Sequence, residues 1–157
     1  MNDDPLFWLS GTDTEMNAAI KMAQQTFSEF VSELELESRR VVPALDYAVV
    51  KAFFCEPATP GQGEHMFVSE VRLEGQTVHG VLTGTPQFVT SLKEGQPVSF
   101  PVSRISDWFI VIGGRGRGGH TIDLIGKRMP RPEYHVAASQ PPFSWFAWRQ
   151  KPWWRFW

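Results

Sequence analysis

The chain has 157 residues, of which 42% are hydrophobic and 20% charged, and this suits one globular domain with a buried core. The net charge of −2 combines an acidic half, with 13 acids and 5 bases in residues 1–78, and a basic half, with 4 acids and 10 bases in residues 79–157. The single cysteine, Cys55, excludes an internal disulfide, and no apolar run approaches the roughly 18 residues that suggest a transmembrane helix.

An amphipathic helix is predicted over residues 13–37, after a leader formed by residues 1–11. Thr12 and Glu15 match the capping box that commonly starts a helix. Apolar side chains then recur every three or four residues, at Met16, Ala19, Ile20, Ala23, Phe27, Phe30, Val31 and Leu34. This stripe favours packing on the core over binding in a partner's groove.

About five strands are predicted after Pro43, because β-branched and aromatic residues gather in short runs separated by turn residues. The runs cover residues 46–54, 64–73, 77–84, 97–103 and 107–112. A helical turn is expected at 88–92, a glycine-rich connection at 113–119 and a short helix or strand at 121–126. From Met129 onward the chain reads as a proline-punctuated extension.

These elements predict an α+β fold, in which the N-terminal helix packs on a curved, mostly antiparallel sheet. The domain should span residues 12–128, and the extended C-terminal tail residues 129–157. The predicted core consists of Phe27, Phe30, Phe54, Phe67, Leu82, Phe100, Trp108 and Ile110.

The hairpin closed by Glu74 and Gly75 sets the expected faces of two strands. Strict alternation places Phe67, Val71 and Leu73 on one apolar face with Val78 and Leu82. Glu64 and His65 point to opposite faces, so they cannot act together on one bound atom. Glu70 and His79 share the polar face and can pair across the hairpin.

Several short motifs occur in a fixed order: Lys51-x-x-Phe54, Glu64-His65-Met66-Phe67, Gly80-x-Leu82, Pro86, Gly95-x-x-Val98 and Ile105-Ser106-Asp107-Trp108. Through them, residues 13–126 resemble the YegJ-like family, bacterial domains of unknown function. The resemblance implies a leading helix and marks Lys51, Glu64, His65, Asp107 and Trp108 as family-motif residues. Phe67 stands where an indole is common in that family. Because no activity is established for the family, the resemblance implies a fold and no reaction.

We predict no metal site and no cofactor, because the four histidines and Cys55 are scattered without the short spacing of metal ligands. The sequence also lacks the nucleophile-elbow motif that a Ser–His–Asp catalytic triad would need. His65 is expected to be structural or to lie at the rim of a ligand site. Asp107 and Trp108 are expected to cap a turn and fill the core, respectively. No catalytic residue is therefore assigned.

The glycine-rich run offers a candidate anion loop at Gly114, Arg115, Gly116, Arg117 and Gly118. Free backbone amides, two arginines and a following helix start would suit a phosphate or carboxylate. The run lacks the Lys-Ser/Thr of a phosphate-binding loop. A flexible tight connection is therefore the favoured interpretation.

Five of the seven tryptophans lie in the last thirteen residues, among cations and prolines. The candidate partner- or lipid-binding residues are Phe143, Trp145, Phe146, Trp148, Arg149, Lys151, Trp153, Trp154, Arg155 and Trp157. Prolines at 141, 142 and 152 argue against one continuous helix. Three docking surfaces stay open for this tail: the domain itself, a protein partner and an anionic membrane.

The favoured hypothesis is a non-catalytic interaction module that binds a protein partner, with an accessory, regulatory or immunity-like role and the tail as an anchor. A second hypothesis is a peripheral membrane protein that docks on anionic lipid. A third is an enzyme on a small anionic substrate, using Lys51, His65 and Asp107 with Arg115 and Arg117. We do not expect nucleic acid as a partner. The N-terminal residues show no signal-peptide pattern, so a cytoplasmic location is expected, either free or at the inner face of the membrane.

Overall fold

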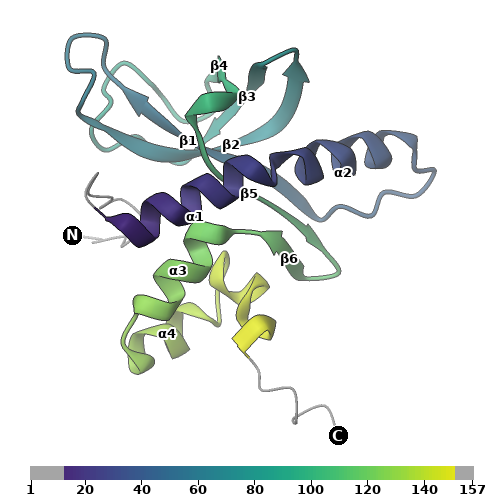
Figure 1. Cartoon of the computed structure of the whole chain (residues 1–157). Helices are drawn as coiled ribbons and strands as arrows, with labels where there is room; N and C mark the ends of the chain where they lie inside the picture. Colours follow the sequence, from purple (N-terminus) through teal and green to yellow (C-terminus); the bar gives the residue numbers. More distant parts are fainter. Residues whose placement is uncertain (1–12, 151–157) are drawn as a thin grey trace, which may run out of the picture.

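Two N-terminal helices, α1 (Thr14–Gln25) and α2 (Phe27–Arg39), lie on one face of a six-stranded sheet in the computed structural model, which describes residues 13–150 (Figure 1). The strand order is β4-β3-β2-β1-β5-β6, and all neighbouring strands are antiparallel. The strands are β1 (Tyr47–Cys55), β2 (Gly63–Glu74), β3 (Thr77–Thr83), β4 (Pro97–Pro101), β5 (Ile105–Ile112) and β6 (Arg115–Gly118). The predicted α+β class is confirmed.

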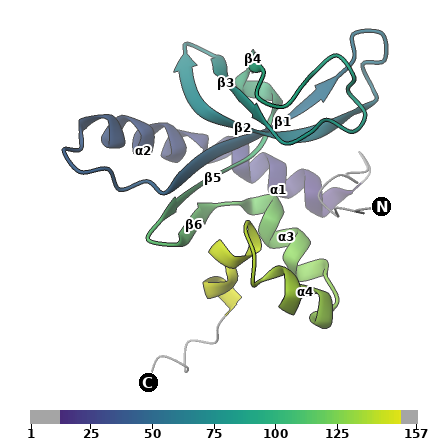
Figure 2. The same ribbon diagram turned by 180° about the vertical axis from the view of Figure 1, so that it is seen from behind.

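The C-terminal part lies on the other side of α1 and β5 from the β2–β4 strands (Figures 1 and 2). It contains α3 (His120–Arg128), α4 (Arg131–Ala137) and the 3-10 turns η2 (Phe143–Trp145) and η3 (Ala147–Gln150); a further turn, η1 (Val102–Arg104), joins β4 to β5. The extension expected from Met129 is thus present, but short helices replace much of the extended chain. No helix within residues 13–150 is long and apolar enough to cross a membrane.

The single helix predicted over residues 13–37 is in fact two helices that meet at Thr26. The apolar stripe runs through both, so the break is invisible to periodicity. The Thr26 hydroxyl donates to the Met22 carbonyl (2.8 Å), and the Trp108 indole N–H approaches the same hydroxyl (3.3 Å). Asp13, one residue after the predicted capping position, caps α1 by accepting the Met16 N–H (3.0 Å).

Two hydrophobic cores lie on opposite faces of the sheet. The first joins α1 and α2 to the sheet and contains seven of the eight predicted core residues. The second lies between β1, β5, α1, α3 and the C-terminal turns, and includes Met16, Val49, Phe109, Val111, Ile122, Ile125, Phe143 and Phe146. Because β5 is buried on both faces, seven consecutive residues are inaccessible.

A β-bulge corrects the predicted faces of β2. The register shifts between Ser69 and Arg72, and Glu70 adopts a left-handed backbone with φ 51°. Val68 therefore pairs with Leu82 and contributes to the first core together with Val71 and Leu73, whereas Phe67 packs on the second core. The prediction that Phe67 shares a face with Leu82 is wrong, because one extra residue reverses all later side chains.

Gly80 lies opposite the bulge and makes it sterically feasible. A Cβ at this position would lie 2.6 Å from the Ser69 carbonyl oxygen and 2.4 Å from a Val68 methyl group. Only glycine fits here without a shift of backbone. The bulge bends the β2–β3 pair and increases its twist.

The edge of β4 offers few hydrogen-bond donors. Backbone bonds from Leu82 to Gln96 and from Val102 to Gln76 (both 2.9 Å) flank the β3–β4 ladder. Because hydrogen-bonded and non-bonded pairs alternate, Pro97, Ser99 and Pro101 direct their backbone outward. Two of these three residues have no N–H, so strand addition at this edge is blocked.

Candidate functional site

The family-motif residues lie on the neighbouring strands β2, β1 and β5. Among them, the Glu64 side chain is buried. Glu64 is 1% exposed. Its carboxylate accepts the backbone N–H groups of Gln87, Phe88 and Val89 at 2.9–3.0 Å. These bonds fix the loop between β3 and β4, in which the helical turn expected at 88–92 is an irregular turn. Glu64 is thus an internal anion that organises a loop.

Asp107, fully buried on β5, performs the same task at the start of α3. Its carboxylate accepts the backbone N–H groups of His120 (3.1 Å) and Thr121 (2.7 Å) and the Thr121 hydroxyl (2.6 Å). The positive end of the helix dipole favours a negative charge there. The anion site at this helix start therefore exists, and the chain fills it with its own carboxylate.

The candidate anion loop forms strand β6. Gly116 and Gly118 are buried, whereas Arg115 and Arg117 are exposed. Arg117 pairs with Glu33 (2.9 Å) and Glu29 (3.7 Å) of α2, and the Arg115 guanidinium lies 5.9 Å from the Trp148 ring centroid. The two arginines are therefore directed to α2 and to the C-terminal turns.

His65 and Ser106 are bonded on the second face of the sheet. His65 Nδ1 lies 2.8 Å from Ser106 Oγ, and this hydroxyl lies 3.2 Å from the Lys51 carbonyl. Because the carbonyl can only accept, both bonds form together when the proton is on Nδ1. Burial, with a smaller contribution from the nearby Lys51 charge, lowers the pKa of His65 to about 4. His65 is therefore neutral at pH 7.

Lys51 is buried at the centre of this cluster. Its strand neighbours are Phe67 on β2 and Asp107 on β5. The ammonium group lies 5.6 Å from the centroid of the Phe67 ring, an arrangement that allows a cation–π interaction. The fold thus brings Lys51, His65 and Asp107 onto adjacent strands, while Glu64 points to the opposite face.

Trp108, the last family-motif residue, is 1% exposed and packs on Phe30 at a ring distance of 5.9 Å. Its indole N–H donates to the Ala23 carbonyl (3.0 Å), which ties β5 to α1. Trp108 is therefore a core residue that also fixes a helix.

The described part of the tail packs on the domain. Phe143 and Phe146 are buried in the second core, and the Trp145 ring lies tilted against the Tyr47 ring, with 5.3 Å between their centroids. Trp148 is 39% exposed. Lys151, Trp153, Trp154, Arg155 and Trp157 lie outside the described residues.

Arg149 links this tail to the edge of the sheet. Its guanidinium pairs with Asp123 of α3 and donates to the carbonyls of Gly118 (3.0 Å) and Gly116 (3.4 Å). The Phe146 ring packs directly on β6, because a Cβ atom added at Gly116 would lie 2.5 Å from that ring. The C-terminal turns thus cap the outer edge of β6.

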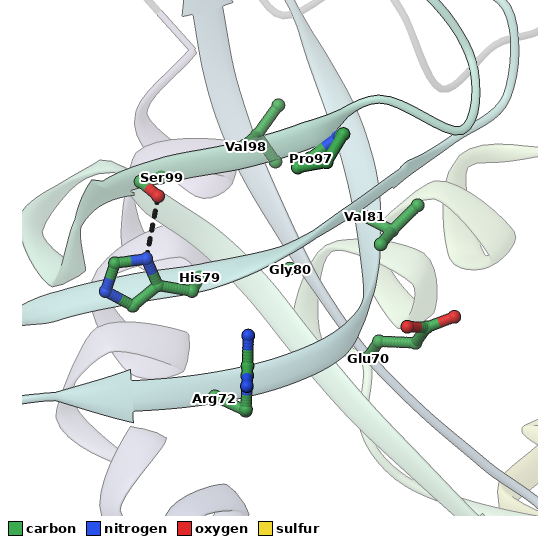
Figure 3. Close-up of a pocket in the computed structure, with 8 residues that line it drawn as sticks. All are labelled: Glu70, Arg72, His79, Gly80, Val81, Pro97, Val98 and Ser99. Atoms are coloured by element: carbon green, nitrogen blue, oxygen red, sulfur yellow. Dashed lines mark hydrogen bonds between the residues drawn. The ribbon is translucent and has the colours of Figure 1, made fainter.

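An open groove of about 470 Å³ lies on the outer face of β2, β3 and β4 (Figure 3). Its lining includes Glu70, Arg72, His79, Val81 and Ser99. His79 Nδ1 lies 2.7 Å from Ser99 Oγ, and Nε2 lies 3.6 Å from the Glu74 carboxylate. The expected pairing of His79 with Glu70 is wrong, because the bulge makes Arg72 the neighbour of His79.

Sequence reasoning missed this groove as a site, because its polar residues alternate like any solvent-facing strand. The available signal was the isolated Gly80 within a strand, which indicates a bulge. Within residues 13–150, no three His, Cys, Asp or Glu side chains gather closely enough to hold a metal ion.

A family profile described as "Uncharacterized protein conserved in bacteria (DUF2314)" matches residues 13–139, so the chain belongs to this family. The chain is 35% identical over 134 residues to a putative ankyrin repeat protein of Neisseria meningitidis serogroup B. The aligned region covers 85% of this chain and 53% of that protein. It therefore spans about half the length of that relative.

The chain is also 29% identical over 119 residues to the uncharacterized protein YegJ of Escherichia coli K12. This aligned region covers 75% of the chain and 71% of YegJ. The resemblance to YegJ is thus confirmed. No solved structure matches the chain.

Proposed function

We propose that this member of the DUF2314 family is a non-catalytic module that binds a protein partner through the outer-face groove. The observation that carries the proposal is the groove itself, which Arg72 and His79 line on an uncovered half of the sheet (Figure 3). Arg72 makes no ion pair within the described residues. An exposed arginine in a concave site is a common anchor of protein interfaces.

Internal bonding of the motif residues also supports binding over catalysis. The enzyme hypothesis placed Asp107 near a cleft with Lys51 and His65, but its carboxylate holds the start of α3. Similarly, Ser106 holds one nitrogen of His65. Side chains whose hydrogen bonds stabilise the fold are less available to act on a substrate than side chains that face a cleft.

The relative from Neisseria supports a role in interaction. It is named a putative ankyrin repeat protein, and this chain matches about half of its length. Ankyrin repeats stack into extended binding surfaces. A family domain that occurs in such a protein fits a function in assembling partners.

Charge reversal in the groove tests the proposal. Full-length protein carrying Arg72→Glu should capture its partner from a bacterial lysate at least about tenfold less well than the parent, because the anchor charge is reversed. Arg131→Glu on α4 is the matched control, since Arg131 is also exposed and α4 lies on the other side of α1 from strands β2–β4 (Figure 1). Equal capture by both variants would exclude this surface.

A second candidate function is docking on an anionic membrane, favoured by Tyr47 and Trp148. These two aromatic side chains are 40% and 39% exposed; Tyr47 lies beside Trp145, and Trp148 lies beside the guanidinium groups of Arg115 and Arg149. Tyrosine, tryptophan and arginine suit the headgroup layer. Co-sedimentation with vesicles containing phosphatidylglycerol, but not with pure phosphatidylcholine, would support it, and Trp148→Ala should weaken that binding.

A further inference from the structure

Strand β2 extends beyond its neighbour β1. The two strands pair only from Gly63 to Val68 on β2, whereas β3 pairs with β2 as far as Glu74. In the part of the chain that the structure describes, residues 69–74 therefore have a strand neighbour on one side only. The bulge causes this divergence, because it bends β2 away from β1.

The backbone of Leu73 faces the unpaired side. Gly75 has φ 59°, which suits a two-residue hairpin turn closed by a hydrogen-bonded pair, here Glu74 with Thr77. Bonded and non-bonded pairs alternate along the ladder, so the pair of Leu73 with Val78 is non-bonded. The N–H and the carbonyl of Leu73 consequently point away from β3.

A groove of about 430 Å³ runs along this edge, between α2 and the end of β2. Four consecutive residues of β2, Val71 to Glu74, line it. Because neighbouring side chains point to opposite faces, a lining of consecutive residues places the groove along the strand edge. In both ribbon views α2 lies between the β2–β3 hairpin and the β5–β6 hairpin (Figures 1 and 2).

The groove is apolar inside and mostly acidic at its rim. Its apolar lining consists of Phe27, Phe30, Val31 and Leu34 of α2 with Val71 and Leu73 of β2. Glu35 and Glu74 contribute two negative charges, and Arg72 one positive charge. A ligand with apolar side chains and a cation would match this lining.

We propose that this edge binds an extended segment of a partner protein, which adds to β2 as a strand. Its main chain bonds to Leu73, its alternate apolar side chains enter the groove, and a lysine or arginine pairs with Glu35. The inference rests on the proposed role in protein binding and assigns a second surface to it. Within residues 13–150, the two outer edges of the sheet are protected, by prolines at β4 and by Arg149 at β6, whereas this inner edge is open to strand addition.

A synthetic peptide, Lys-Thr-Val-Thr-Val-Thr-Val-Lys, serves as the probe and is titrated into ¹⁵N-labelled full-length protein. Binding should shift the Leu73 amide signal and slow its hydrogen exchange. A control peptide with N-methyl groups at alternate residues keeps every side chain but removes the main-chain donors. It should bind about fivefold or more weakly, because the bond from the peptide N–H to the Leu73 carbonyl is lost.

Two variants locate the site on the protein. Leu73→Pro removes the outward N–H without breaking a bond to β3, and it should weaken binding of the probe, measured from the shifts of the neighbouring amide signals. Glu35→Lys reverses a rim charge on the surface of α2 and should weaken the probe at least fivefold. Glu133→Lys, an exposed glutamate of α4, is the matched control and should bind as the parent does.

Several results would overturn the inference. These are equal binding of both peptides, shifts confined to the outer-face groove, and a concentration-dependent dimer that excludes the probe from the edge. The last result would assign the edge to a second copy of the chain. Arg72 lines both grooves, so the two proposals are separated at His79, which lines only the outer-face groove. Loss of the probe site with retention of capture that His79→Ala weakens would remove this inference alone, whereas the reverse pattern would remove only the proposed function of the outer groove.

Discussion

The sheet has two halves that differ in how many of their faces are covered. Strands β1 and β5 lie between two cores, and β5 is buried for seven consecutive residues. Strand β4 instead alternates between buried and exposed residues, as expected when only one face is covered. The covered half holds most of the family-motif residues, and the open half holds the groove of Figure 3.

The number of covered faces determines how the charged side chains of each half are satisfied. In the covered half each carboxylate must be satisfied internally, because burying an unpaired charge is expensive. Asp107 accordingly binds the start of α3. In the open half Arg72 is exposed, so its charge needs no partner inside the protein.

The largest effect should come from Trp108. Replacing it with alanine removes a large side chain and the bond to Ala23, so the free energy of unfolding should fall by about 3–5 kcal/mol. Urea denaturation measures this loss. Trp148→Ala is the control and should cost about 1 kcal/mol or less, since Trp148 is 39% exposed. Similar losses for the two tryptophans would contradict the division into covered and open regions.

Asp107→Asn should lower stability by about 2–4 kcal/mol, because the neutral amide cannot accept the full set of bonds at the start of α3. Hydrogen exchange should show that α3 opens before the rest of the protein. Asp46→Asn, at an exposed carboxylate that accepts the Gly114 N–H (3.1 Å), should cost below about 1 kcal/mol. Cooperative opening of α3 together with the whole sheet would refute a local role.

The third prediction concerns pH and His65, whose pKa in the fold is about 4 against an ordinary 6.5. Between these values the unfolded chain binds more protons than the folded protein. The contribution of neutral His65 is therefore complete above pH 6.5 and is lost as pH falls toward 4, by at most about 3 kcal/mol. Chemical denaturation of the parent and of His65→Asn across this range should show a smaller decline in the variant. An identical decline would mean that His65 protonates freely.

The smallest effect is expected at the capped edge of β6. Arg149→Ala should lower stability by about 1–2 kcal/mol, because the carbonyls of Gly116 and Gly118 lose a charged donor and Asp123 loses its partner. Melting curves measure the change, with Arg131→Ala as the exposed control. A stability equal to that of the control would show that the C-terminal turns are held by Phe143 and Phe146 alone.

Strand and helix positions were predictable where local pattern is sufficient. The runs of β-branched and aromatic residues located β1 to β5, and the motif order identified the relationship to YegJ. Strand β6 was missed, because Arg-Gly-Arg-Gly has little strand propensity and forms only by pairing with β5. The candidate residues from Lys151 onward lie outside the described residues and stay predictions.

Periodicity and side-chain chemistry are enough to predict the α+β class, most of the first core and the opposite directions of Glu64 and His65. Contacts between distant segments instead set the break at Thr26, the bulge at Glu70 and the partners of the buried carboxylates. A bulge adds one residue to one strand, and its consequences depend on which strands pair. Likewise, Glu64 binds a loop and Asp107 binds a helix start that lie 13 or more positions away in the chain. Such contacts exist only after the chain has folded, so no local pattern can specify them.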